Sequence, residues 1–223
     1  LGYCGLAPQP TAEWTVLIYF CGDGDLEIYG VSELLQLEAA GGSPQVNVLF
    51  QLDRVPGPGI KEPIMRLMRE TWTDGNWTGS RRYLLRPDRD PVRIDSLLLE
   101  KQGEIDASSA TGFEEFCRWG ITHFPARRYA LFPSNHGAGT TGICFDETSG
   151  KLMRFPALEQ ALLRLGAFRR QQDGKDRFDF LSFWACLMGT LEVGYDVRDS
   201  AEYLFGTETR NYAQSNASWL KAL

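Results

Sequence analysis

Apolar runs that suit buried strands alternate with helical segments along much of the chain. Residues Trp14 to Phe20 (WTVLIYF) form a nearly continuous apolar run, which a parallel strand buried on both faces requires. A helical segment from Leu26 to Ala40 follows and stops at Gly41-Gly42, and a second apolar run covers Val46 to Leu52. The beginning of the chain therefore predicts a strand–helix–strand unit with a right-handed crossover.

The same alternation returns in the second half of the chain. From Ser108 to Phe124 the apolar residues fall on one helical face, and Thr111 followed by Glu114 has the spacing of a capping box. The elements expected next are a strand at Arg128 to Pro133, a helix at Pro156 to Leu165, a strand that opens the stretch Phe178 to Glu192, and a last strand at Tyr203 to Gly206. This order predicts an α/β fold with a mostly parallel central sheet and helices on both faces.

The segment between these two halves is less regular. Two β-like runs, Ile64 to Trp72 and Arg81 to Leu85, flank the turn signal Asp74-Gly75-Asn76. We expect a peripheral hairpin here, inserted at about 54–104 into a single domain that covers 14–223, with 1–13 as an extended lead-in.

Composition narrows the function classes. The chain has 223 residues and a net charge of −6, without a dense basic run, which argues against a nucleic-acid partner. No stretch reaches the roughly 18 to 20 apolar residues of a membrane span. Five cysteines without a C-x-x-C pair fit neither a complete disulfide framework nor a zinc knuckle. The chain starts at Leu1, so no signal peptide is visible, and a removed leader and an arbitrary start both stay open.

Cys186 lies within the apolar stretch FDFLSFWACLMGTLE. We expect the strand to end just before it and a helix to begin at Leu187, which places its sulfur near the positive end of a helix dipole and favours the thiolate. The alternative is a buried cysteine that fills a small core site, and the stretch alone favours that alternative.

His136 makes a catalytic role for Cys186 more plausible. It follows a predicted strand within Ser134-Asn135-His136-Gly137-Ala138-Gly139, where the glycines allow a close approach of a ligand to the backbone. If the two strands are neighbours, both side chains leave the same edge of the sheet, where a thiol and its base must meet. The alternative is a loop histidine that bonds locally.

Other polar residues are assigned structural roles. The second histidine, His123, lies near a helix C-terminus, where a positive charge complements the dipole. Asp23, Asp25 and Glu27 could gather a hard cation, but their spacing does not match a calcium loop and helix capping is the commoner use. Asp146-Glu147 leaves the same two interpretations open.

Three segments together resemble the clostripain family of cysteine peptidases, which are relatives of caspases. They are WTVLIYFCGDGDLE, then NHGAG with GICFDETSG, and FDFLSFWACLMGTLEVGYDVRDSAEYLFGTE, so the resemblance spans about Trp14 to Glu208. It implies a caspase-like α/β/α sandwich, a dyad with His136 as base and Cys186 as nucleophile, and peptide or protein substrates cut after Arg or Lys. The N–H groups of Gly137 and Cys186 are the expected oxyanion donors. No cofactor is required, although calcium is compatible with the acidic loops without assigned ligands. Members of the family are often exported by bacteria to the periplasm or the outside, and they mature by cutting themselves.

The chain also departs from the family pattern. Trp184 stands where the family has an aspartate that helps to form a pocket for a basic side chain, and an indole can stack on a guanidinium but cannot pair with it by charge. Glu208 remains a candidate acid near that pocket. We expect the family's C-terminal part to be lacking, because the residues after Thr209 do not resemble its usual continuation. Lys151 and Arg154 lie in the interval where the family's self-cleavage falls.

Three hypotheses follow. The first is a cysteine endopeptidase that uses His136 and Cys186. The second is a catalytically inactive caspase-like domain that binds a peptide or a partner protein. The third is an unrelated hydrolase with a cysteine nucleophile on a parallel sheet.

Overall fold

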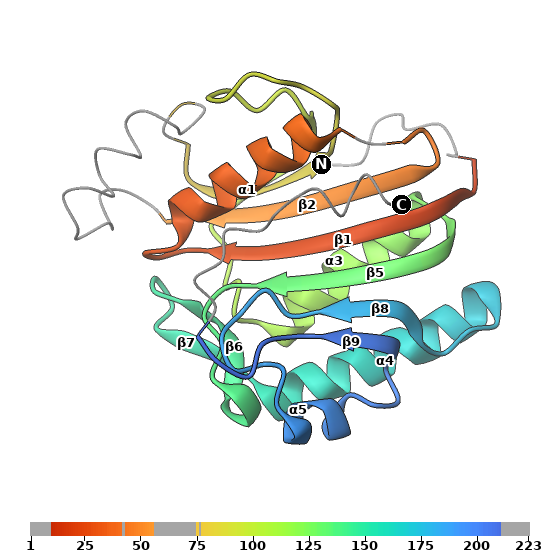
Figure 1. The fold of residues 1–223 in the computed structure, drawn as a ribbon. Helices are drawn as coiled ribbons and strands as arrows, with labels where there is room; N and C mark the ends of the chain where they lie inside the picture. Colours follow the sequence, from red (N-terminus) through yellow and green to blue (C-terminus); the bar gives the residue numbers. More distant parts are fainter. Residues whose placement is uncertain (1–9, 42, 56–74, 76, 211–223) are drawn as a thin grey trace.

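A seven-stranded sheet forms the centre of the protein, in a computed structural model that describes residues 10–41, 43–55, 75 and 77–210. Its strand order is β4-β3-β2-β1-β5-β8-β9 (Figure 1). The parallel strands are β1 (Ala12–Gly22), β2 (Val46–Arg54), β5 (Ala126–Ser134), β8 (Phe178–Ser182) and β9 (Ala201–Phe205). At one edge β3 (Gly79–Leu84) and β4 (Leu97–Gly103) run antiparallel. The predicted α/β architecture with a mostly parallel sheet is therefore confirmed.

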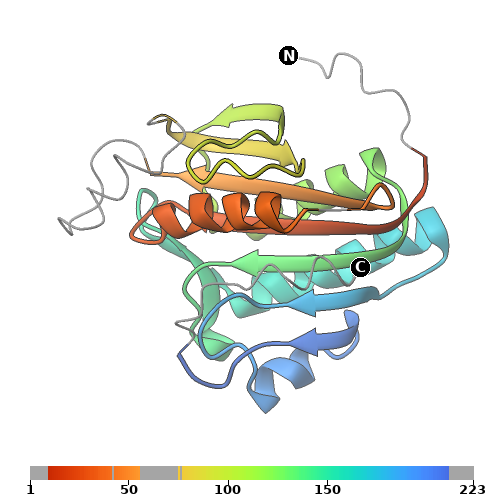
Figure 2. The same ribbon diagram turned by 45° about the horizontal axis from the view of Figure 1, so that its top comes forward.

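Helices cover both faces of the sheet (Figures 1 and 2). Helix α1 (Glu27–Ala40) lies on one face, and α3 (Ala110–His123) and α4 (Phe155–Asp173) lie on the other. Alternate residues of β1 serve the two sides, because Val16, Ile18 and Phe20 join the core under α1, whereas Leu17, Tyr19 and Cys21 join the core under α3 and α4. This double burial explains why the strand is apolar at nearly every position.

Small elements complete the fold at the carboxyl end of the sheet. After β5 comes the 3-10 turn Gly139–Thr141, followed by an antiparallel hairpin of β6 (Gly142–Asp146) and β7 (Lys151–Arg154). Along the chain, helix α5 (Leu191–Asp196) follows β8 and precedes β9. Among the described residues, no helix is both long and apolar enough to span a membrane.

The start of α3 differs from the predicted capping box. Ser109 is the N-cap, and its side chain accepts a hydrogen bond of 3.2 Å from the N–H of Gly112. Thr111 lies inside the first turn, and the Glu114 carboxylate binds Arg118 and Arg164 instead of reaching back to a cap. The predicted apolar face of this helix is buried as expected.

The expected hairpin is described only in part. Its second run corresponds to β3, whereas Ile64 to Trp72 lies outside the described residues. Within the described chain β3 pairs with β2 and with β4, a strand that the sequence pattern did not predict. These two strands therefore extend the main sheet at its edge.

The helix predicted from Leu187 is wrong. A turn follows Trp184, and α5 begins only at Leu191, where Thr190 caps it by accepting a hydrogen bond from the N–H of Val193. Cys186 consequently lies five residues before the first helical residue and not at a helix N-terminus. The helix dipole therefore does not stabilise its thiolate. The position of Cys186 is set instead by β8, the strand that precedes it.

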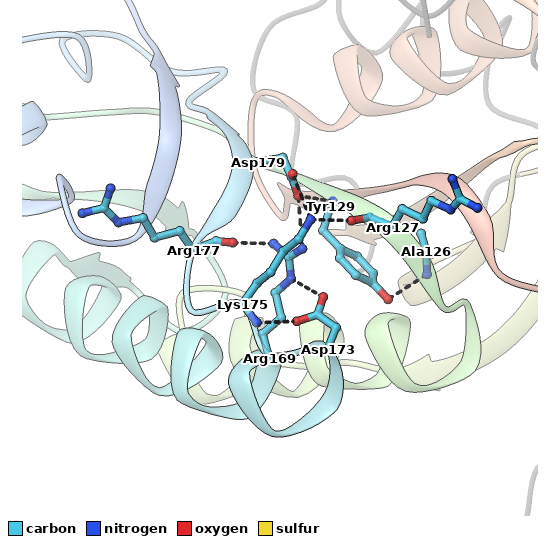
Figure 3. A network of polar contacts seen from close by, with 8 residues as sticks. All are labelled: Ala126, Arg127, Tyr129, Arg169, Asp173, Lys175, Arg177 and Asp179. Atoms are coloured by element: carbon cyan, nitrogen blue, oxygen red, sulfur yellow. Dashed lines mark hydrogen bonds and ion pairs between the residues drawn. The ribbon is translucent and has the colours of Figure 1, made fainter.

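A buried arginine ties the beginnings of β5 and β8 to the end of α4 (Figure 3). The Arg169 guanidinium lies 3.0 Å from Asp173 and 3.2 Å from Asp179, and its side chain is fully buried. It also donates to the carbonyl of Arg177 at 2.5 Å and covers the ring of Tyr129. This network holds the two strands together at the end of the sheet opposite to His136 and Cys186.

Candidate active site

The pairing of β5 with β8 places His136 and Cys186 at corresponding positions. Ala130 lies opposite Phe180 and Leu131 opposite Leu181. The same offset of fifty residues continues to a bridge between Ser134 and Trp184 beyond the strands. His136 and Cys186 each follow this bridge by two residues, so both lie beyond the same carboxyl edge of the sheet.

Gly137 brings the two loops into direct contact. A Cβ atom on this residue would lie 2.2 Å from the carbonyl oxygen of Cys186 and 2.8 Å from the Cβ of Ala185. Such separations are well below van der Waals contact, so no side chain fits here. The absence of one lets the backbone next to His136 approach the backbone of Cys186.

An aspartate holds the His136 ring. The Nε2 atom lies 2.8 Å from Oδ1 of Asp25, in a pair that is half exposed on both sides. This hydrogen bond raises the pKa of His136, a change that burial partly offsets and that Glu147 reinforces. The same hydrogen bond lowers the pKa of Asp25. The pair therefore favours an imidazolium next to a carboxylate.

The backbone at His136 is fixed by its neighbour Asn135. The Asn135 amide donates to the carbonyl of Cys21, and its Oδ1 accepts from the N–H of Phe145 at 3.0 Å and from that of His136 at 2.5 Å. Asn135 thus connects the ends of β1, β5 and β6 around the histidine.

Sequence reasoning missed the role of Asp25. We expected it as a helix cap or a cation ligand, but α1 starts after Leu26 without any side-chain cap. The signal available was its place just beyond the carboxyl end of β1, the strand that pairs directly with β5. The alternative of a cation held by Asp23, Asp25 and Glu27 is not supported, because Glu27 forms a buried ion pair of 2.7 Å with Arg54.

Cys186 is half-buried in a turn that the segment after β9 supports. Leu187, the next residue, has a φ of 63°, a left-handed conformation that is uncommon for a leucine. Its N–H donates to the carbonyl of Thr209 at 3.1 Å, and that of Gly189 donates to Thr207 at 2.9 Å. Glu208 lies exposed between these two partners, so the structure brings this candidate acid next to the turn with the cysteine.

Trp184 lies at the base of the same turn. Its carbonyl accepts from the Ser134 hydroxyl at 3.3 Å, and its half-buried ring meets the ring of Phe132 edge to face at 4.9 Å between centroids. The side chain packs against the core under α1. Position 184 therefore provides an indole ring and not a carboxylate.

The two candidate cleavage residues lie in the β6–β7 hairpin. Lys151 is exposed, and its Nζ pairs with Asp106 at 2.9 Å. Arg154 is exposed where β7 passes into α4. Both lie in the interval between the strands of His136 and Cys186.

The sequence is similar to those of a known protein family. The model of the clostripain family matches residues 18–215. Clostripain of Hathewaya histolytica is 24% identical over 200 residues, a match that covers 82% of this chain and 36% of clostripain.

Solved structures of C11 proteases share the fold of this chain. An inactive zymogen C11 protease from Parabacteroides distasonis superimposes with a TM-score of 0.64 at 24% identity, over 94% of this chain and 53% of that one. A secreted C11 cysteine protease from Bacteroides thetaiotaomicron, bound to an irreversible peptide inhibitor, gives 0.62 at 21% identity, over 89% and 49%. The expected caspase-like fold is therefore confirmed.

The chain spans about a third to a half of the length of these relatives. The family model nevertheless covers most of this chain, including both candidate catalytic residues. The protein belongs to the clostripain family.

Proposed function

We propose that this chain is the catalytic unit of a cysteine endopeptidase, with Cys186 as nucleophile and His136 as general acid and base. The observation that carries the proposal is the shared register of β5 and β8, which puts the two residues at the same edge of the sheet. Family membership supports the same reaction class.

The reaction would proceed by acyl transfer. The Cys186 thiolate attacks the scissile carbonyl carbon, a C–S bond forms, and the C–N bond breaks as the His136 imidazolium gives its proton to the leaving amine. Water then hydrolyses the thioester with His136 as base. Since Asp25 engages Nε2, we assign the transferred proton to Nδ1. The N–H groups of Gly137 and Cys186 are the proposed oxyanion donors, a role worth about 2.7 to 4 kcal/mol per donor.

We also propose that the substrate residue before the cut is basic, with Arg preferred over Lys. Glu208 supplies an exposed carboxylate next to the Cys186 turn, and the half-buried Trp184 offers a ring for stacking. A planar guanidinium can use both contacts, whereas an ammonium gains less from stacking.

We further propose that the protein works after export from the cell. A secreted relative among the solved structures supports this. Fractionation of the native host into cytoplasm, periplasm and medium would test it, and a purely cytoplasmic location would contradict it.

The test of the activity is a panel of fluorogenic peptides with Arg, Lys, Leu or Asp at the cleaved position. We expect turnover of the Arg peptide, lowered by at least about 10³-fold in Cys186→Ala and in His136→Ala. Glu208→Gln should lower turnover of the Arg and Lys peptides and leave any residual turnover of the Leu peptide unchanged.

Labelling with iodoacetamide, located by mass spectrometry, separates the alternatives. A labelled Cys186 with turnover supports the peptidase. A folded protein without turnover and without labelling of Cys186 would contradict it and favour a domain that only binds peptides, for which the Trp184 substitution is the motivating observation.

A further inference from the structure

A cavity lies between the edge strands of the sheet and the beginning of α3. Its volume is about 300 Å³, at the lower end of the range for ligand pockets, roughly 300 to 1,000 Å³. The sheet contributes Gln51 of β2, Arg82 of β3 and Gln102 of β4. The loop before α3 and the first turns of that helix contribute Asp106 and Glu115. The cavity therefore has the size and the polarity for a small polar molecule.

Two buried side chains at this cavity carry donors without an acceptor. Gln51 is 2% exposed and Arg82 is 7% exposed, and we call these two residues the floor of the cavity. Nε of Arg82 donates to Oε1 of Gln51 at 2.7 Å, and Nη1 donates to Glu100 at 3.0 Å. Because an arginine only donates, the first bond also fixes the orientation of the Gln51 amide. Within the described ranges, neither Nε2 of Gln51 nor Nη2 of Arg82 donates to any acceptor, and neither atom is fully enclosed, so both are open to the cavity.

The floor is held in place by its surroundings. The Arg82 guanidinium lies 4.9 Å from the ring centroid of Trp119 and 5.5 Å from that of Phe116. The Glu100 carboxylate holds it from another direction, and Arg82 in turn holds Gln51. Buried donors of this kind cost free energy unless water or a ligand supplies the acceptor. The floor is thus preorganised for an oxygen acceptor.

The start of α3 adds to the attraction for negative charge. Thr111 and Gly112 belong to its first turn and line the cavity. The Ser109 cap accepts only from the N–H of Gly112. The partial positive charge of a helix N-terminus favours an anion near the first turn. Together with the two buried donors of the floor, it indicates a site for a carboxylate.

The rim of the cavity is acidic instead. The Glu115 carboxylate is exposed, and no ion pair with a described residue holds it. The half-buried Asp106 pairs with Nζ of Lys151 at 2.9 Å, and Glu100 balances the charge of Arg82. The negative charge of Glu115 is thus left over. A plain anion is therefore attracted by the floor and repelled at the rim, whereas an ammonium is attracted at the rim.

We propose that this cavity binds a free α-amino acid. Its carboxylate accepts hydrogen bonds from Nη2 of Arg82 and Nε2 of Gln51, and its ammonium lies at the rim toward Glu115. A small zwitterion satisfies both the open donors and the unbalanced acid, and the volume leaves room for a small side chain. Neither His136 nor Cys186 lines the cavity, and the inference does not depend on the peptidase activity.

The test uses the full chain carrying Cys186→Ala, so that self-cleavage does not affect the result. The isotope-labelled protein is titrated with L-alanine, and the backbone amide signals of Thr111 and Gly112 are followed by NMR. We expect both signals to shift to saturation with a Kd of about 1 mM or lower. N-acetyl-L-alanine lacks the ammonium and should bind about two- to fivefold more weakly. L-alanine methyl ester lacks the carboxylate and should bind at least about tenfold more weakly.

Gln51→Glu is the informative variant, because it keeps the acceptor for Arg82 and replaces the Nε2 donor by a carboxylate oxygen. Its affinity for L-alanine should fall at least about tenfold. Gln160→Glu makes the same change of charge at an exposed position of α4 and should bind like the parent. If Gln51→Glu fails to fold, Gln102→Glu provides the comparison, since this side chain is only partly buried and its Oε1 can still accept from the Ser80 hydroxyl.

Glu115→Gln tests the rim separately. Its affinity for L-alanine should fall about two- to fivefold, the range of an exposed ion pair, while its affinity for N-acetyl-L-alanine should not fall. An equal loss for both compounds would contradict the placement of the ammonium.

Three further results would overturn the proposal. The first is a folded parent whose Thr111 and Gly112 signals do not shift with L-alanine at about 10 mM, ten times the expected Kd, which would leave water as the partner of the floor. The second is tighter binding of inorganic phosphate than of L-alanine, because the cavity would then hold a simple anion. The third is undiminished binding of L-alanine by a folded Gln51→Glu protein, because the ligand would then lie elsewhere.

Discussion

At the scale of single residues, the charge of His136 depends on Asp25. Their hydrogen bond raises the pKa of the imidazole, with a smaller contribution from Glu147. We therefore expect Asp25→Asn to lower the pKa of His136 in a titration followed by NMR. Only two histidines occur in the chain, so the spectrum holds just two imidazole signals to assign. An unchanged pKa of His136 in the variant would show that the pair does not form in solution.

The same pair predicts how stability responds to pH. The folded pKa of His136 lies above its unfolded value, so its contribution to stability is fully present below about pH 6.5 and is lost as pH rises through the folded pKa. We expect Asp25→Asn to lower the free energy of unfolding near pH 6 more than near pH 9. Urea denaturation at the two pH values measures this difference, and an equal effect at both would contradict it.

Gly137 sets the distance between the loops that carry His136 and Cys186. A methyl group there would meet the Cys186 carbonyl oxygen at 2.2 Å, so Gly137→Ala should destabilise the fold by about 1 to 3 kcal/mol. Gly112→Ala is the matched control, because its nearest neighbour is at 3.6 Å, and it should be neutral or slightly stabilising within α3. Denaturant unfolding measures the free energy of unfolding of both variants. Equal values would count against the close approach of Gly137 to Cys186.

At the scale of elements, the buried Arg169 connects α4 with the starts of β5 and β8. Removal of its charge takes this partner from Asp173 and leaves Asp179 with Lys175 at 3.7 Å. We expect Arg169→Ala to lower the free energy of unfolding by about 3 kcal/mol. The neighbouring Arg170 forms an exposed pair with Asp176, and Arg170→Ala should cost less than about 1 kcal/mol. Similar losses in the two variants would argue against the network in Figure 3.

Most elements, but not all of their ends, could be predicted from the pattern of apolar residues. The buried faces of β1 and α3 follow directly from their spacing. The cap of α3 could not be chosen, because several residues before it can cap a helix and only the tertiary structure selects Ser109. The apolar residues after Cys186 suited a helix, yet pairing with the segment after β9 holds them in a turn. Strand β4 escaped prediction because most of its residues are partly exposed and do not alternate.

At the scale of the whole molecule, the connection between β5 and β8 is where self-cleavage is expected. Lys151 and Arg154 are exposed, although the hairpin of β6 and β7 must open locally before a peptide bond there can reach Cys186. We predict a cut near one of them in the wild type and none in Cys186→Ala or in the double variant Lys151→Gln/Arg154→Gln. Denaturing gels report the fragments, and an intact wild-type chain that is active on peptides would contradict the prediction.

The two fragments should stay together after such a cut. One would carry β1 to β5 with His136, and the other would carry α4, β8 and β9 with Cys186. The pairing of β5 with β8 and the packing of α4 against α3 join them. Gel filtration under native conditions should therefore give one species at the mass of the uncut chain, and two separate species would disprove this.

The carboxyl ends of the strands could be recognised in the sequence as the place for a thiol and a base, but the meeting of three buried aspartates there could not. His136 and Cys186 each follow their own strand, so local pattern and fold class suffice to relate them. Asp23, Asp53 and Asp146 come from three distant segments, and no local spacing reveals that they meet. The pairing of Asp25 with His136 has the same origin, since only the neighbouring positions of β1 and β5 bring them together.

The offset of fifty residues between β5 and β8 has a consequence for the recognition of distant homologues. The site needs the ladder of hydrogen bonds and the two residues that follow each strand, but it places no demand on the length of the chain between them. Insertions in the turn between β6 and β7 leave the pair in place, whereas the loss of one residue from the end of β5 shifts His136 relative to Cys186. A search pattern should therefore fix the distance from each strand end to His136 and to Cys186, and leave the interval between the two motifs free.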